Sequence, residues 1–375
     1  MPDIVPVTLL TGFLGSGKST LLSRILRDPR FSDTAVVVNE FGEVGLDGFL
    51  VEHSREQTVE MTTGCLCCTI RGDIRQTLLR LHDRRTRGEI PAFERLIVET
   101  TGLADPAPVV HTLIADASLS KRFALSGIVT TVDAIAGAAT LDRQTECVKQ
   151  AAVADRIVLT KTDLATGPEE RTGVEMLRRS LARLNPGARI LDRNDPGFDL
   201  RALFDTALFD PMSRPAEVRR WLNAEAFAEE EEHGHDHEHG HEHGHGQDHG
   251  HGHDHAHDVN RHGPDIHAFC VELDEPVSIM AFTVALELLI ANQGEDLLRV
   301  KGVVNLKERP DRPVIIHGVQ HVLHEPVWLE GWPDGDRRTK IVFVTRNIRK
   351  ETIEAFFQAW RNAGDDGAMG SLARP

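Results

Sequence analysis

The segment that starts at Gly12 has the residues of a phosphate-binding loop. It reads Gly12-Phe-Leu-Gly15-Ser16-Gly17-Lys18-Ser19, a complete G-x-x-x-x-G-K-S motif after an apolar run. In such a loop the glycines let backbone N–H groups converge on phosphate, the lysine reaches the β- and γ-phosphates, and the serine hydroxyl ligates Mg²⁺. We therefore predict a nucleotide and Mg²⁺ site in which Lys18 and Ser19 are also catalytic. The predicted nucleotide-binding residues of this loop are Gly12, Gly15, Ser16, Gly17, Lys18, Ser19 and Thr20.

A second segment fits the same site because an acidic residue ends an apolar run. Leu96-Ile-Val-Glu99 is followed three positions later by Gly102. We expect the Glu99 carboxylate to lie close to the Mg²⁺ ligands and to be catalytic. We expect the Gly102 N–H to sense the γ-phosphate of the bound nucleotide.

A third segment predicts the choice of base. Thr160-Lys161-Thr-Asp163 follows the apolar run Ile157-Val-Leu. An aspartate at this position accepts from both N1–H and N2–H of guanine, donors that adenine does not present in that arrangement. We therefore predict GTP rather than ATP, with Thr160, Lys161 and Asp163 at the base. The alternative is a charged strand end without a role in base selection, because Thr160 replaces the asparagine usual in GTPases.

Three of the five cysteines are gathered in Cys65-Leu-Cys67-Cys68, directly after Gly64. Three thiols can supply the soft ligands that Zn²⁺ prefers, with a carboxylate or water completing a tetrahedron. In an extended backbone Cys65 and Cys67 share a face while Cys68 points away, so convergence on one ion requires a turn, which Gly64 favours. The alternative is a group of buried core thiols. We expect Cys147 and Cys270 to be ordinary buried thiols.

Residues 229–258 form a low-complexity tract that contains 12 of the 20 histidines, 10 acidic residues and 6 glycines. All the tract histidines lie at odd positions from His233 to His257. Such a composition buries too little apolar surface to fold, so we predict a disordered connection. Its imidazoles and carboxylates suit weak, exchangeable metal binding, and the alternative is a solvated linker without a metal role. Near the end of the chain, His317, His321 and His324 have no clear role. The first two could share a strand face and ligate a metal, but we favour the alternative of ordinary surface or core histidines.

Length and charge limit the kinds of partner. The chain has 375 residues, enough for two or three domains, and a formal net charge of −16. That charge argues against nucleic acid or an anionic membrane surface as a partner. The sequence has neither an apolar run of bilayer-spanning length nor a signal-peptide pattern at its start, so we expect a cytoplasmic protein.

Apolar runs alternate with amphipathic stretches through the first two hundred residues, which is typical of an α/β fold with a mostly parallel sheet. The predicted strands are 5–11, 34–39, 95–100, 126–132, 156–160 and 188–191, and the predicted helices are 18–26, 74–82, 107–115, 145–152 and 169–184. A smaller α+β domain is expected afterwards, with strands 266–273, 298–306, 313–316 and 340–345 and helices 278–291 and 350–360. We therefore predict a P-loop NTPase domain over 1–225, a disordered linker over 226–263, and the α+β domain over 264–375.

Taken in order, these motifs closely resemble those of the CobW-type GTPases, which are related to the metallochaperones UreG and HypB. The motifs are G-F-L-G-S-G-K-S, N-E-F-G-E-V-G-L-D, G-C-L-C-C-T, V-E-T-T-G-L-A-D-P and T-K-T-D. The resemblance continues past the histidine-rich tract, in Arg299-Val-Lys-Gly302 and in the segment from Ile316 to Trp332. The resemblance implies a GTPase that binds a transition metal and passes it to a client metalloprotein. It further implies that Glu40 and Glu43 lie in a nucleotide-sensing segment at the metal site and that Cys65, Cys67 and Cys68 ligate the metal.

The resemblance leaves the metal and the client open. Thiolate ligands and the order of divalent affinities favour Zn²⁺ over Co²⁺, so zinc is our first prediction. The alternatives are a cobalt chaperone for cobalamin synthesis and a histidine-rich zinc storage or sensing protein in which nucleotide sets conformation. The sequence does not specify the oligomeric state.

Overall fold

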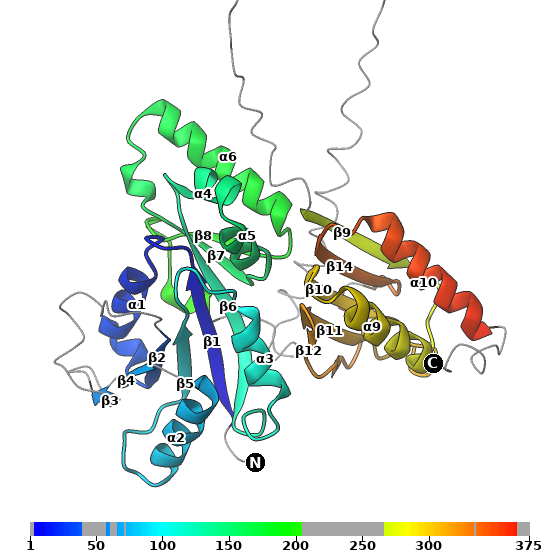
Figure 1. Cartoon of the computed structure of the whole chain (residues 1–375), viewed down its shortest axis with the longest axis horizontal. Coiled ribbons are helices and arrows are strands. Elements are labelled where there is room, and N and C mark those ends of the chain that lie inside the picture. The colour runs from blue at the N-terminus through cyan, green and yellow to red at the C-terminus, as the bar shows by residue number, and fades with distance from the viewer. Residues whose placement is uncertain are drawn as a thin grey trace, which may run out of the picture.

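The computed structural model describes residues 4–39, 58–60, 66–70, 73–204, 266–333 and 335–365. These residues form two units, each built around its own sheet (Figure 1). Among the described residues, the last element of the first unit is η3, a short helix over Leu200–Leu203, and the first element of the second unit is strand β9, which starts at Ile266. The predicted linker over 226–263 lies outside the described residues, and the predicted domain limits at 225 and 264 stay predictions.

The first sheet has eight strands in the order β3-β4-β2-β5-β1-β6-β7-β8. Only the edge pair β3–β4 is antiparallel, and every other neighbouring pair is parallel, which confirms the predicted fold class. The strands are β1 (Val5–Gly12), β2 (Thr34–Asn39), β3 (Thr58–Glu60), β4 (Leu66–Ile70), β5 (Arg95–Glu99), β6 (Phe123–Asp133), β7 (Arg156–Thr160) and β8 (Arg189–Asp192).

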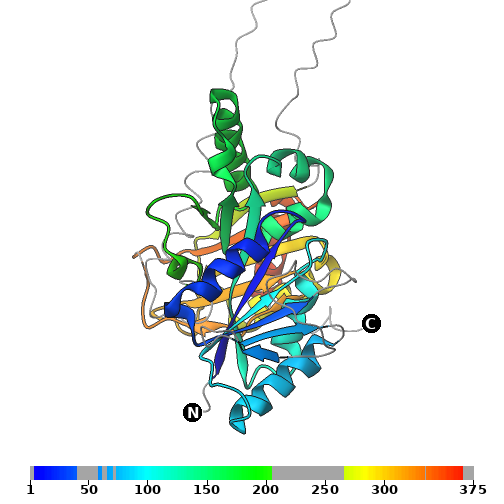
Figure 2. The same ribbon diagram turned by 90° about the vertical axis from the view of Figure 1, so that its left-hand side faces the viewer.

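Helices cover both faces of this sheet because its strands are apolar on both sides. Along β2, for example, Ala35 and Val37 join the core under α2 and α3, while Val36 and Val38 join the core under α1. Figure 2 shows α1 in front and the strands of the second unit behind it. The helices are α1 (Lys18–Arg27), η1 (Pro29–Phe31), α2 (Ile74–Thr86), α3 (Ala107–Ala115), α4 (Gly137–Arg143), α5 (Thr145–Ala152), η2 (Thr162–Leu164) and α6 (Pro168–Leu184).

The second unit is an antiparallel sheet with two helices on one face, as predicted for the α+β domain. Its strand order is β12-β11-β10-β14-β9, with β13 paired to β11. The strands are β9 (Ile266–Leu273), β10 (Leu297–Val304), β11 (Val314–Val319), β12 (Val322–Leu323), β13 (Val327–Trp328) and β14 (Thr339–Arg346), and the helices are α9 (Ile279–Gln293) and α10 (Lys350–Asp365).

The two faces of the second sheet have different neighbours. One packs its apolar residues against α9 and α10, on the side away from the first unit (Figure 1). On the other face, Leu298 and Val344 share a core with residues of α5 and α6. Val319, at the end of β11, joins the core of α2 and α3. The C-terminal unit is thus packed against the helices of the first unit by apolar contacts.

Most predicted elements are confirmed within a few residues, and the differences have local causes. The predicted strand at 126–132 begins three residues earlier, at Phe123, where its backbone pairs with Val5. The short elements β3, β4, α4, β12 and β13 were not predicted, since two to seven residues show no clear periodicity. None of the helices in the described ranges is long and apolar enough to cross a membrane.

The two isolated cysteines differ in exposure. Cys147 on α5 is buried as predicted, and burial raises the pKa of its thiol to about 12. The prediction for Cys270 is wrong, because that residue is only partly buried. Its strand, β9, is the edge strand of the second sheet, where one side lacks a neighbouring strand.

Candidate functional site

The connection between β1 and α1 has the backbone of a phosphate-binding loop. Gly12, Gly15 and Gly17 all have positive φ angles, of 137°, 72° and 92°. A Cβ at Gly12 would lie 2.5 Å from the Thr131 carbonyl oxygen, so a larger residue has no room there. Glycine is therefore required at this position by both conformation and space.

The Lys18 ammonium lies at the centre of this loop. Its Nζ donates to the carbonyl oxygens of Gly12 at 2.7 Å and Phe13 at 3.1 Å. Burial lowers the pKa of Lys18, and the Glu99 carboxylate opposes that effect. Ser16 is also inside the loop, with its hydroxyl 2.7 Å from that of Thr131, whereas Thr20 is exposed on α1.

The end of β5 brings the predicted acidic residue to the loop. The Ser19 hydroxyl donates to Glu99 Oε1 at 3.4 Å, and Glu99 is only 4% exposed. A hydroxyl and a carboxylate side by side are hard oxygen donors, so these residues fit Mg²⁺.

Gly102 is in direct contact with the phosphate-binding loop. A Cβ added to it would lie 2.6 Å from the backbone nitrogen of Leu14 and 2.8 Å from the Leu14 Cα. Its carbonyl oxygen accepts a hydrogen bond from Nε2 of the buried Gln150 on α5, at 3.2 Å. The sequence-predicted residues Lys18, Ser19, Glu99 and Gly102 thus meet at the carboxyl edge of the sheet.

Thr160, the departure from the usual GTPase motif, has a defined structural place. Its side chain is fully buried, and its hydroxyl lies 2.7 Å from the carbonyl oxygen of Ser16 and 3.3 Å from that of Val132. The hydroxyl therefore ties the end of β7 to the phosphate-binding loop. The neighbouring Lys161 has a left-handed backbone, with φ 59°, and its Nζ donates to Asp133 Oδ2 at 2.6 Å.

Asp163 is exposed and has a partner that the sequence analysis missed. Its Oδ1 accepts from Nδ2 of Asn194 at 2.6 Å. Asn194 follows β8, and its backbone N–H donates to Asp192, which also accepts from Thr162. The run Leu191-Asp-Arg-Asn194 at a strand end was the available signal, but it belongs to no motif that we recognised.

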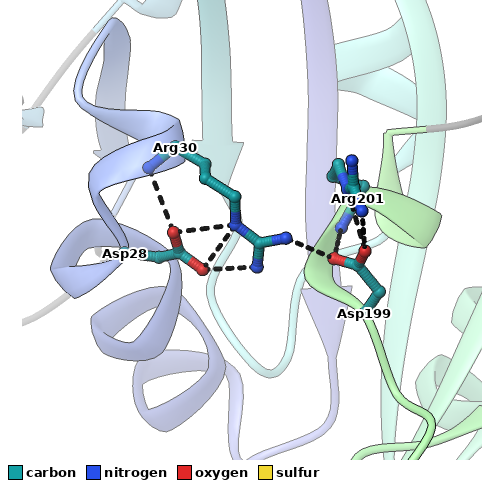
Figure 3. A network of polar contacts seen from close by, with 4 residues as sticks. All are labelled: Asp28, Arg30, Asp199 and Arg201. Carbon is teal, nitrogen blue, oxygen red and sulfur yellow. Dashed lines mark hydrogen bonds and ion pairs between the residues drawn. The ribbon is translucent and has the colours of Figure 1, made fainter.

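Exposed ion pairs connect the chain after Asn194, at Asp199, to the end of α1 (Figure 3). Arg30 pairs with Asp28 at 2.6 Å and with Asp199 at 3.0 Å, and Arg201 pairs with Asp199 at 2.7 Å. The hydrogen bonds from Arg201 lower the pKa of Asp199 to about 2. The network joins η1 to the chain that follows Asn194.

The predicted metal site lies largely outside the described part of the chain. Cys65, Glu40 and Glu43 are not described, and Cys67 and Cys68 are described only as backbone positions of β4. There, Cys67 is level with Val36 of β2 and Cys68 with Val37. Cys67 and Cys68 are successive positions of this strand, so the turn that would let all three cysteines converge on one ion does not lie between them.

The three C-terminal histidines do not share one strand face. His321 is in the exposed turn after β11 and does not share a strand face with His317. Instead, the rings of His317 and His324 are 6.2 Å apart, next to the cations Arg299 and Lys301. Burial, followed by these cations, lowers the pKa of both rings, to about 3 for His324. Within the residues that the structure describes, no three His, Cys, Asp or Glu side chains are arranged to hold a metal ion.

Comparison with known families matches both units. Residues 6–192 match the family described as "CobW/HypB/UreG, nucleotide-binding domain", and residues 266–361 match the "Cobalamin synthesis protein cobW C-terminal domain". The zinc chaperone YjiA from Escherichia coli is 33% identical over 357 residues, which cover 95% of this chain and 99% of YjiA. The zinc-regulated GTPase metalloprotein activator 1 from Schizosaccharomyces pombe is 33% identical over 51% of this chain and 46% of its own length.

Solved structures give the same relationship. The crystal structure of Zn(II)-bound YjiA GTPase from E. coli has a TM-score of 0.67 at 30% identity, and covers 96% of this chain and 99% of its own. A Zn(II)-bound triple mutant of YjiA GTPase, in which a glutamate and two successive cysteines are alanine, has a TM-score of 0.70 with the same identity and coverage. With both domains matched over nearly the whole length, the chain belongs to the CobW family of P-loop GTPases.

Proposed function

We propose that this GTPase is a zinc metallochaperone, which binds Zn²⁺ at the Cys65-Leu-Cys67-Cys68 segment and transfers it to a client metalloprotein. One observation carries the proposal. The strand that contains Cys67 and Cys68 is hydrogen-bonded to β2, inside the same sheet whose carboxyl edge forms the phosphate-binding loop. The metal-binding segment and the nucleotide site then share one rigid framework, as coupling between them requires.

The nucleotide chemistry is assigned to residues that the fold brings together. Gly12, Gly15 and Gly17 shape the loop, and Lys18 neutralises phosphate charge in it. Ser19 holds Mg²⁺, with Glu99 beside it; when bound, the ion neutralises charge that develops on the phosphates. Glu99, through its contact with the Ser19 hydroxyl, keeps that hydroxyl oriented. Gly102 lies against Leu14, which supports its proposed role in sensing the γ-phosphate.

Guanine recognition is assigned to Asp163. Its partner Asn194 holds one carboxylate oxygen, which fixes the orientation of the group that reads the base. The Thr160 hydroxyl bonds to the loop carbonyl of Ser16, so Thr160 links base site and phosphate site mechanically. Because Thr160 replaces the asparagine usual in GTPases, the selection of guanine over adenine is left mainly to Asp163. We expect GTP to bind more tightly than ATP.

Zinc ligation is assigned to Cys65, Cys67 and Cys68, with Glu40 and Glu43 as the carboxylates that the family resemblance implies. The solved YjiA triple mutant replaces a glutamate and two successive cysteines, the residue types present here. YjiA is described as zinc-bound both with and without these residues. We therefore expect more than one class of zinc site in this chain too, with residues 229–258 as a weak, exchangeable buffer.

The deciding experiment measures coupling between metal and nucleotide. Zinc affinity of a protein lacking residues 229–258 is measured by competition with a chelating dye, with GDP and with a non-hydrolysable GTP analogue. A chaperone is expected to bind zinc with different affinities in the two nucleotide states, by about 5- to 150-fold for a typical coupling between sites. Equal affinities in both nucleotide states would instead indicate a storage protein. Repeating the titration with Co²⁺ tests the cobalt alternative.

Two variants sharpen the assignment of residues. Cys67→Ser with Cys68→Ser is expected to remove tight zinc binding and its nucleotide dependence, while GTP binding by the metal-free protein stays nearly unchanged. Lys18→Ala is expected to abolish nucleotide binding, because the loop loses the cation that neutralises phosphate. A Lys18→Ala protein that still bound GTP with wild-type affinity would contradict the assigned site.

A further inference from the structure

A side chain of the C-terminal unit, that of Gln320, reaches the nucleotide edge of the first unit. Gln320 lies in the turn between β11 and β12, and its Nε2 donates to Asp105 Oδ2 at 3.1 Å. Asp105 follows Gly102 by three residues, in the connection between β5 and α3. Lys149 Nζ, on α5, donates to the same carboxylate oxygen at 3.0 Å. One carboxylate therefore joins the loop after β5, helix α5 and the C-terminal unit.

The segment from Gly102 to Asp105 is held at both ends by α5. Gln150 is fully buried, and its Nε2 donates to the carbonyl oxygens of Gly102 and Ala104. Lys149, its neighbour in the sequence, binds Asp105. On the opposite side, Gly102 lies against the backbone of Leu14 in the phosphate-binding loop. Asp105 and Gly102 are therefore the two ends of one short segment that contacts both α5 and the phosphate-binding loop.

The backbone at Gln320 is a second, independent observation. Its φ is 51°, in the left-handed region that favours glycine or asparagine and strains other residues. The turn itself needs only the backbone N–H, which donates to the Leu297 carbonyl at 2.9 Å. A glycine would form that turn with less strain. The long amide side chain is therefore explained by its contact with Asp105 and not by the turn.

We propose that Gln320 is a positioning residue for GTP hydrolysis. By holding Asp105, it fixes the Gly102 segment against the phosphate-binding loop, so the C-terminal unit sets how the nucleotide site responds to the γ-phosphate. The inference rests on the proposed role of Gly102. Because linkage is reciprocal, any ligand or partner that moves the β11–β12 turn is expected to change the affinity for GTP while leaving that for GDP nearly constant.

The test uses a substitution that removes the contact without straining the turn. Gln320→Gly keeps the favoured backbone conformation and deletes the amide. Asn347→Gly is the matched control, since Asn347 is an exposed residue with a φ of 60° in the same unit, between β14 and α10. The full-length protein is used, and thermal melting confirms that both variants stay folded. We measure kcat and KM for GTP, and the affinities for GDP and a non-hydrolysable GTP analogue.

Gln320→Gly is expected to change kcat and the ratio of analogue to GDP affinity by roughly fivefold or more, the lower end of typical couplings between sites. GDP affinity should match that of Asn347→Gly, and the melting temperature should not fall below that of this control. A purely structural residue would instead lower the melting temperature and leave that ratio unchanged. If kcat and the affinity ratio of Gln320→Gly equal those of the control, the proposal is overturned.

A third variant separates this inference from the proposed site. In Gly102→Ala the new methyl group meets the Leu14 backbone, so analogue affinity is expected to fall relative to GDP affinity. If Gly102→Ala shows that loss and Gln320→Gly does not, only the role of Gln320 is refuted. If Gly102→Ala leaves the ratio unchanged, the role of Gly102 is refuted and the inference falls with it.

Discussion

Two of the polar contacts between the C-terminal unit and the first unit differ in their chemistry. Asp155 precedes β7 and therefore lies at the amino edge of the first sheet, whereas Asp105 follows β5 and lies at the carboxyl edge. Asp155 is 1% exposed and accepts from Arg299 at 2.6 Å and Lys301 at 2.9 Å. The Asp105 side chain is 26% exposed and shares one oxygen between Lys149 and Gln320.

The difference in burial between Asp155 and Asp105 indicates different roles for the two contacts between the units. A buried charge cluster is costly to disrupt, since any charge that loses its partner stays out of water. A partly exposed hydrogen bond exchanges readily with water, and its loss costs little. We interpret the Asp155 cluster as the fixed joint between the units and the Asp105 contact as the adjustable one, which lies beside the nucleotide site.

Asp155→Asn is expected to have the largest effect. It removes the charged carboxylate that accepts from Arg299 and Lys301, and breaking such a cluster typically costs about 3–5 kcal/mol of unfolding free energy. Chemical denaturation of the full-length protein measures this loss. Asp105→Asn, the matched change at the other contact, should cost much less. Equal losses for the two variants would contradict the distinction between the joints.

Acid should lower the stability of the folded protein by favouring protonation of the buried histidines His317 and His324 on unfolding. The pKa of His324 is lowered to about 3 by burial and by the neighbouring Arg299. The unfolded chain therefore takes up a proton near pH 6.5, while the folded protein does so only near pH 3. Stability should fall as the pH drops between these values, by up to about 1.4 kcal/mol per pH unit for this group.

Denaturation series at pH 7 and pH 5 check that prediction. His324→Gln should flatten the pH dependence between them, because glutamine does not titrate. His317 faces the same groups, and Asp155 partly offsets the cations around both rings, so some dependence should remain in the variant. An unchanged slope in His324→Gln would show that this ring does not titrate as described.

Thr160→Val is expected to have a smaller effect on stability and a clearer one on nucleotide binding. Valine keeps the shape but removes the hydroxyl that bonds to Ser16 and Val132, at a cost of about 1 kcal/mol. Because the phosphate-binding loop loses a tie to the base site, GTP and GDP affinity should both fall. Thr130→Val is the control, since its hydroxyl bonds to the Gln150 carbonyl instead. Similar nucleotide affinities in the two variants would refute a special role for Thr160.

Arg30→Ala should have the smallest effect on stability. Its ion pairs with Asp28 and Asp199 lie at the surface, where water and salt screen them (Figure 3). We expect a melting temperature close to that of the wild type in 0.15 M salt. A loss comparable to that of Asp155→Asn would show that exposed pairs matter here as much as buried ones.

Local sequence determined most of the elements and the nucleotide motifs. Val5–Gly12 forms a strand, and the Lys18 ammonium donates to a carbonyl oxygen at its end. Strand propensity, glycine conformation and the start of a helix all depend on residues that are close in the sequence. The same holds for Glu99 and Gly102, whose spacing places them at a strand end. The family resemblance rests on these local motifs, and the comparisons confirm it.

Tertiary structure decided the contacts between residues that are distant in the chain. No local pattern joins Gln320 to Asp105 or Arg299 to Asp155, and Asn194 reaches Asp163 only because β8 pairs with β7. The turn after Val319 separates His321 from His317 and returns His324 to it, which strand periodicity alone did not indicate. Such contacts depend on how sheets and helices pack, since packing and not spacing in the sequence determines which of these side chains meet.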